Sequence, residues 1–166
     1  MGKRGSPRLI TGLITTTTIA AAAIAGAAHA ACSIDTVTIR DDAGTVQFTV
    51  DVADSAAERA QGLMFVEQMA TMQGMLFVYE RPQHASFWMR NTLISLDMLF
   101  VGEAGVVQNI HAMAQPLDET PIFGGEDIQF VLEINGGLAA MLGLEVGDQM
   151  QHPSFGTDAI WPCEIN

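Results

Sequence analysis

The residues that could form a binding site share one property: they are polar or aromatic and stand in predicted apolar strands. They are Trp88, Arg90, Asp97, His111 and Glu133. Ligand pockets place a few polar groups on apolar walls, so we expect these five side chains to line a cleft that binds a small molecule or a partner. The guanidinium of Arg90 could hold a ligand carboxylate or phosphate beside Trp88.

Two alternatives to this binding cleft follow from the same residues. Arg90 could form an internal ion pair with Asp97 or Glu133, because charges within apolar strands are usually paired. Asp97 and Glu133 could instead act as the acid and base of an envelope glycan hydrolase. No serine stands in a Gly-x-Ser-x-Gly elbow beside His84 or His111. We therefore favour a noncatalytic role without a cofactor, and leave turnover open.

Methionines suggest another function. Nine follow residue 30, and four lie close together in the sequence: Met64, Met69, Met72 and Met75. Thioether sulfur is a soft ligand that suits Cu(I), so a periplasmic copper-binding protein is an alternative. Methionine is also an adaptable core residue, and core packing explains the same residues without a metal.

The N-terminus has the pattern of a signal peptide. Lys3, Arg4 and Arg8 precede an uncharged stretch that ends in the small residues Ala28 and Ala30. We expect cleavage near Ala30/Ala31, which divides the chain into a signal peptide (1–30) and one mature β-rich domain (31–166). The protein would then be periplasmic or secreted, with no stable insertion in the membrane.

Two cysteines, Cys32 and Cys163, stand at opposite ends of the mature chain. In an oxidising compartment such a pair predicts one disulfide. No Cys-x-x-Cys motif or Cys/His cluster points to zinc or thioredoxin-type chemistry.

The charge of the mature domain excludes one class of partner. Four arginines and no lysine stand against 19 acidic residues after residue 30. Phosphate backbones and anionic headgroups need cations to neutralise them. We therefore expect no nucleic-acid binding.

Short apolar segments separated by glycine-rich turns indicate a mainly β domain. Ser55 and Glu58 have capping-box spacing and predict a short helix that ends near Gly62, and a second is expected over 136–142. Strands are expected over 36–40, 45–52, 75–80, 86–90, 93–101, 106–113, 128–134 and 146–152. This pattern predicts an antiparallel β-sandwich or partly open barrel with two short helices.

Several ordered motifs resemble a known family. They are ERAQGLM (58–64), GMLF (74–77), FWMRNT (87–92), LDMLF (96–100), DETP (118–121), LEINGG (132–137) and VGD (146–148). The chain resembles, over about 36–150, a widespread bacterial and archaeal family of unknown function whose members often carry a signal peptide. The resemblance implies a small β-sandwich-like fold with minor helices, and it implies no activity, cofactor or catalytic residue. The two cysteines lie outside the matched motifs.

Overall fold

The computed structural model describes residues 1–2, 32–41 and 44–164. The predicted signal segment, apart from its first two residues, lies outside the described residues. Within the described ranges, no helix is long and apolar enough to cross a membrane.

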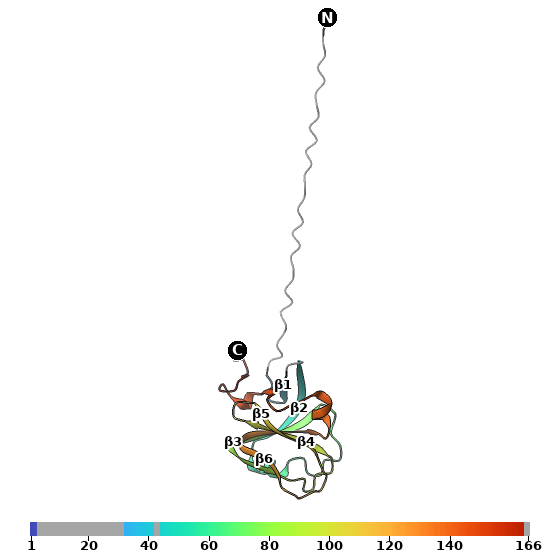
Figure 1. The fold of residues 1–166 in the computed structure, drawn as a ribbon, viewed down its shortest axis with the longest axis vertical. Coiled ribbons are helices and arrows are strands. Elements are labelled where there is room, and N and C mark those ends of the chain that lie inside the picture. The colour runs from blue at the N-terminus through green and yellow to red at the C-terminus, as the bar shows by residue number, and fades with distance from the viewer. Residues whose placement is uncertain (3–31, 42–43, 165–166) are drawn as a thin grey trace.

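The structure is mainly β, as predicted, and its sheet curls into a half-barrel (Figure 1). Its elements in chain order are β1 (Thr36–Arg40), β2 (Thr45–Ala53), α1 (Ala56–Gln61), β3 (Gln73–Phe87), β4 (Leu96–Gly102), β5 (Val107–Ala114), β6 (Ile122–Asn135), α2 (Leu138–Leu142), β7 (Gln149–Gln151) and the short 3-10 helix η1 (Pro153–Phe155).

The strands lie in the order β5-β4-β6-β3-β2-β1-β7. A bridge between Val106 and Gln149 joins the beginning of β5 to β7 and so connects the two edges of the sheet at one end. The prediction of purely antiparallel pairing needs correction, because β2 and β3 are parallel. The chain returns between these two strands through α1, since parallel neighbours need a crossover connection.

Local signals explain the first elements. In β2 the residues Phe48 and Val50 are buried while Gln47 and Thr49 are exposed, as the alternating sequence predicts. The predicted capping box of α1 is confirmed: the Ser55 hydroxyl accepts from the Glu58 amide, and the Glu58 carboxylate accepts from the Ser55 amide.

The expectation of two strands over 75–80 and 86–90 is wrong, because β3 continues through Arg81 and Pro82. Proline lacks an amide donor, so within a sheet it occurs at bulges or edges. The pairing of β3 with β6 shifts register between Val78 and Gln83 and again near Ala85. These irregularities accommodate Pro82 and let one long strand replace two short ones.

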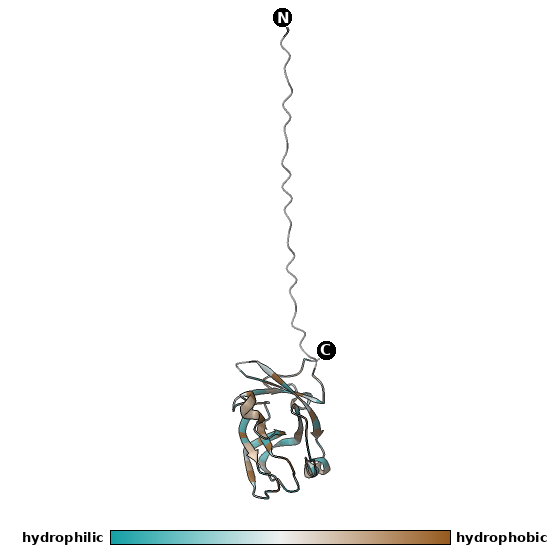
Figure 2. Ribbon diagram, turned by 90° about the vertical axis from the view of Figure 1, so that its right-hand side faces the viewer, coloured by the Kyte–Doolittle hydropathy of each residue, from teal (hydrophilic) through white to brown (hydrophobic). Residues whose placement is uncertain are grey.

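Two apolar clusters lie on opposite faces of the central strands. The inner cluster takes residues from all seven strands, for example Phe48, Leu99 and Leu132. The outer cluster covers the other face of β3, β4 and β6 and includes Phe77, Phe100 and Val131. Residues from the loops after α1 and β3 pack against the outer cluster. Figure 2 shows the brown apolar segments interleaved with polar ones along the curled strands.

The predicted disulfide between Cys32 and Cys163 is confirmed, with 5.7 Å between the two Cα atoms and a sequence separation of 131 residues. Nearby, the buried His152 ring bonds the Ile34 carbonyl through Nε2 at 2.9 Å and accepts from the Ser154 amide through Nδ1. Burial lowers the pKa of His152. The two ends of the domain are thus joined by a covalent bond and by a neutral imidazole.

Candidate functional site

The cleft that combines a buried acid, cations and aromatic rings lies on the outer face, between β3 and the loops after α1 and β3. It has a volume of about 100 Å³, and we call it the Glu133 cleft. Its polar lining consists of Arg59, Gln61, Ser86, Arg90, Thr92 and Glu133, and its rings are Phe77, Tyr79, Phe87 and Trp88. Gly62, Leu63 and Met64 complete the side formed by the end of α1.

Glu133 belongs to β6 and lies between two methionines. In the sheet register Met75 of β3 and Met98 of β4 stand directly opposite Glu133, and paired residues share a face. Within the sheet, the Glu133 side chain is therefore flanked by two methionines. Only 4% of the residue is exposed. Among the described residues, its carboxyl oxygens have no hydrogen-bond or ion-pair partner.

Burial raises the pKa of Glu133 to about 8. An ionised carboxylate in an apolar surrounding loses hydration that nothing replaces, so the protonated form is favoured. At pH 7 the side chain is mostly a neutral acid, which can donate one hydrogen bond and accept others. The cleft thus contains a hydrogen-bond donor that is not engaged by the protein.

Two of the four arginines that follow residue 30 line the cleft, and they differ in their partners. The Arg59 guanidinium donates to the carbonyls of Asp54 and Val78 and pairs with Glu80 at 3.1 Å. It also lies 4.9 Å from the centre of the Tyr79 ring. Arg59 is therefore largely committed to holding α1 against β3.

Arg90 has no ion pair and no side-chain hydrogen bond within the described part of the chain. Its guanidinium lies 5.5 Å from the centre of the Trp88 ring, and both side chains are exposed. The alternative of an internal pair with Asp97 or Glu133 is thus wrong. This cation lines the same cleft as Glu133 and is available to a ligand.

Tyr79, the one tyrosine in the sequence, lies on β3 near Glu133. Burial is the main cause that raises the pKa of Tyr79, and the nearby Arg59 opposes it. The phenol is therefore neutral over the physiological range. Together with Glu133 it gives the cleft hydroxyl groups without negative charge.

Asp97 lies elsewhere, although it is also fully buried. Its carboxylate accepts from the amides of Met113, Gly137 and Ala139, each at 2.8 Å. Because Asp97 pairs with Ile134 and the next residue of β4 pairs with Glu133, the two carboxyls project from opposite faces. The expected acid and base of a hydrolase are therefore not brought into one cleft.

His111 also stays outside the lining of the Glu133 cleft. It stands opposite Met98 on β5, so Met98 and its strand separate it from Glu133. Of the five predicted residues, the structure brings together Trp88, Arg90 and Glu133. Whether any of the five binds a ligand stays a prediction.

The four methionines of the copper hypothesis have different surroundings. Met64 lines the Glu133 cleft and accepts a bond from the Asn91 amide at 3.8 Å. Met69 and Met75 pack against the outer cluster, whereas Met72 is 36% exposed. Over the described ranges no group of three His, Cys, Asp or Glu residues could hold a metal ion. Copper binding by these thioethers stays a prediction.

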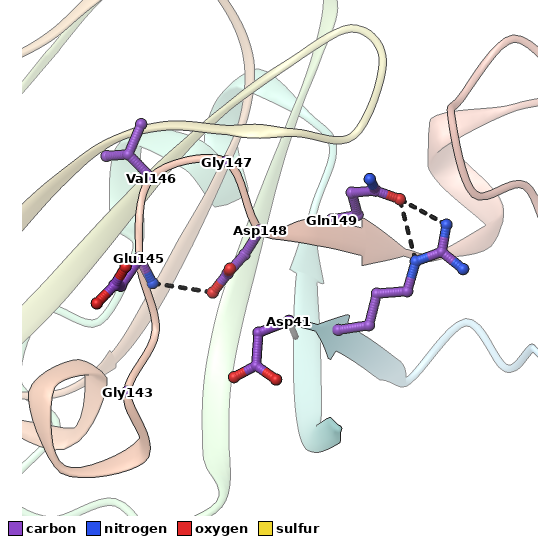
Figure 3. Close-up of a pocket in the computed structure, with 8 residues that line it drawn as sticks. Asp41, Gly143, Glu145, Val146, Gly147, Asp148 and Gln149 are labelled. Carbon is purple, nitrogen blue, oxygen red and sulfur yellow. Dashed lines mark hydrogen bonds between the residues drawn. The ribbon is translucent and has the colours of Figure 1, made fainter. Parts of the chain in front are cut away.

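A second hollow, of about 550 Å³, lies beside β1 and β7 (Figure 3). Its polar side chains bond within the protein: Arg40 donates to Gln149, and the Asp148 carboxylate accepts from the Glu145 amide. The Arg40 guanidinium also lies 4.5 Å from the centre of the Trp161 ring. Although larger, this hollow offers no buried polar side chain without a partner, so we place the candidate site at Glu133.

Sequence reasoning missed Arg59 and Tyr79. Arg59 lies on a helix whose face toward β3 cannot be deduced from local pattern, and Tyr79 stood in a strand read as core. The rarity of these residue types was the one available signal, because the chain after residue 30 has four arginines and a single tyrosine.

Comparison with known proteins supports the fold and leaves the activity open. Residues 37–152 match the family described as DUF192, Uncharacterized ACR. A protein of unknown function from Novosphingobium aromaticivorans is 46% identical, with a TM-score of 0.68, covering 69% of this chain and 82% of its own. A Sinorhizobium meliloti protein, provisionally described as a transcription regulator, is 36% identical, with a TM-score of 0.69, covering 74% and 95%. No curated protein matches the chain.

Proposed function

The chain belongs to the DUF192 family, and we propose that it is an exported, noncatalytic protein that binds a small organic molecule in the Glu133 cleft. The observation that carries this proposal is the buried Glu133 carboxyl, which faces the cleft without a protein partner. Buried polar groups are normally bonded, and a perturbed acid in a cleft is a candidate functional group.

The stability of the protein gains nothing from an acid at this position. Ionisation of Glu133 is unfavourable in the folded state, and a leucine or methionine would fill the space between Met75 and Met98. A bound molecule would supply the missing hydrogen-bond partner. The aromatic rings of Phe77, Phe87 and Trp88 would contact its apolar part.

Export is the second part of the proposal. The disulfide between Cys32 and Cys163 suits an oxidising compartment, and the first thirty residues have the composition of a signal peptide. Mass spectrometry of the protein from the periplasmic fraction should give a mature form that begins near Ala31 with no free thiol. A full-length, reduced protein confined to the cytoplasm would contradict export.

Binding can be tested with the two tryptophans as internal probe and control. Trp88 lines the Glu133 cleft, whereas Trp161 stacks with Arg40 beside the other hollow. In nitrogen-15 NMR spectra, small molecules from a fragment library should move the indole N–H signal of Trp88 and leave that of Trp161 unchanged. The substitution Ser86→Phe, which narrows the cleft, should abolish these shifts. A library that never moves the Trp88 signal would overturn the proposal.

A further inference from the structure

We infer that the molecule bound in the Glu133 cleft is a small organic acid carrying one negative charge, with Arg90 facing its charge and Glu133 donating a hydrogen bond to one of its oxygens. This inference rests on the proposed function and names the chemical class of the ligand. Three observations support it: the distribution of charge, the state of the buried acid and the size of the cleft.

The charge distribution favours an anion. Four arginines stand against 19 acids in the mature domain, yet Arg59 and Arg90 both line this cleft. The charge of Arg59 is balanced by Glu80, and Glu133 is neutral at pH 7, so Arg90 leaves the cleft with a positive charge. In a protein that otherwise repels anions, this cleft is the place where one would be attracted.

The number of free cations favours one negative charge over two. A phosphate monoester has a charge close to −2 and is commonly held by several cations. Of the two arginines among the described residues that line the cleft, only Arg90 has no ion-pair partner. A carboxylate needs a single guanidinium, which it can bind through two parallel hydrogen bonds.

The buried acid requires an oxygen acceptor on the ligand. A protonated carboxyl donates a short, strong bond to a carboxylate and a weaker one to a carbonyl. The titratable groups that line the cleft together with Glu133 are Tyr79 from β3, Arg59 from α1 and Arg90 from the loop after β3, while Met98 of β4 stands opposite Glu133. None of them competes for its proton in the structure.

The volume limits the size of the bound group. About 100 Å³ is less than the roughly 150 Å³ of a cavity that holds benzene. A chain of three or four carbons therefore suits the enclosed space. Larger substituents could extend along the exposed Trp88 ring.

The test uses four probes with four carbon atoms each that differ in charge: butyrate, butyramide, butylamine and succinate. Titrated against the exported, disulfide-bonded protein at pH 6.5, butyrate should move the Trp88 indole signal with at least about tenfold higher affinity than butyramide, because a bond to a charged group is stronger than one between neutral groups. Butylamine, which is a cation, and succinate, which has two negative charges, should bind less well than butyrate.

Two variants separate the roles of the residues. Arg90→Gln should bring the butyrate and butyramide affinities to within about threefold, whereas Arg81→Gln, on an exposed arginine outside the cleft, should leave the tenfold ratio intact. Wild-type affinity for butyrate should fall as pH rises through about 8, where Glu133 loses its proton. Glu133→Gln retains a neutral N–H donor and should bind butyrate without that fall.

The outcomes distinguish this inference from the proposed function. If all four probes move Trp88 with similar affinity, or butylamine binds best, the cleft binds small molecules but the monoanion class is wrong. If neither these probes nor any fragment moves Trp88, the proposed function fails as well. An unchanged ratio in Arg90→Gln would overturn the role of Arg90.

Discussion

Asp97 and Glu133 are buried carboxyls on neighbouring strands, and they face opposite sides of the same sheet. On the inner face, Asp97 accepts from three backbone amides that belong to β5 and to the turn leading into α2. On the outer face, Glu133 lies between two methionines and meets a cleft. Two carboxyls that are both buried therefore differ in their partners: Asp97 is bonded to three amides, and Glu133 to no protein group among the described residues.

The difference shows which buried acid serves the fold. The Asp97 carboxylate satisfies amides at the beginning of α2, where Gly137 offers no side chain for capping. Glu133 accepts no hydrogen bond from the described part of the protein, and its own ionisation is unfavourable in the folded state. A buried acid without partners is retained at a cost in stability, which is expected at functional sites and not in cores.

The largest predicted effect comes from removing the inner acid. Asp97→Ala should destabilise the protein by about 5 kcal/mol or prevent folding, because three buried amides lose a charged acceptor. Asp97→Asn should cost about half as much, since its amide group would face the Ala139 N–H. Urea denaturation measures both, with the exposed Asp51→Asn as control. If Asp97→Asn were as stable as the wild type, the conclusion that Asp97 stabilises the fold and Glu133 does not would be wrong.

Removing the outer acid, Glu133, should raise the stability of the protein, whereas removing Asp97 lowers it. Because the pKa of Glu133 rises from 4.5 to about 8 on folding, the folded state binds more protons, and stability falls as pH increases from 4.5 to 8. Glu133→Gln cannot ionise and should be more stable than wild type by about 3 kcal/mol at pH 7 and similar to it at pH 4. Thermal unfolding as a function of pH measures this, with Glu119→Gln as the exposed control.

His152 should make stability depend on pH less strongly than Glu133 does, and in the opposite direction, with a loss as the pH falls. Its lowered pKa means that the unfolded chain binds the extra proton first, so stability is fully present above pH 6.5 and is lost as pH falls below it. His152→Gln should lack this loss. The same pH series checks the prediction in the Glu133→Gln variant, which retains His152. A rise in its stability on acidification from pH 6.5 to 5.5 would contradict the prediction.

The smallest predicted changes in stability are those of the two arginines of the cleft, and they should differ from each other. Arg59→Gln should cost about 1–2 kcal/mol, because it loses bonds to two carbonyls and one carboxylate. Arg90→Gln should change stability by less than about 0.5 kcal/mol, as for a surface residue without such contacts. Equal losses in urea denaturation would show that Arg90 is structural and weaken its assignment to a ligand.

Much of the fold follows from local signals in the sequence. The capping box of α1, the alternation in β2 and the terminal cysteines each predict a feature that the structure confirms. Features that depend on distant partners were not predictable. The parallel pairing of β2 with β3 depends on where the chain returns after α1, and the passage of β3 through Pro82 depends on its irregular pairing with β6.

The same distinction holds for the candidate site. Trp88, Arg90 and Glu133 stand out because they interrupt apolar runs, and the structure places all three on one cleft. Asp97 interrupts an apolar run in the same way, but its partners are 16 to 42 residues away in the sequence. Sequence pattern identifies buried polar residues, and only the register shows which of them find partners.

The bond between Cys32 and Cys163 makes almost the whole described domain a single covalent ring. A protease that cuts any one loop within this ring would therefore open it without releasing a fragment. Both halves would remain on one molecule until a reductant separates them. With this bond intact, the protein could thus be cut once and still keep its sheet and its cleft together.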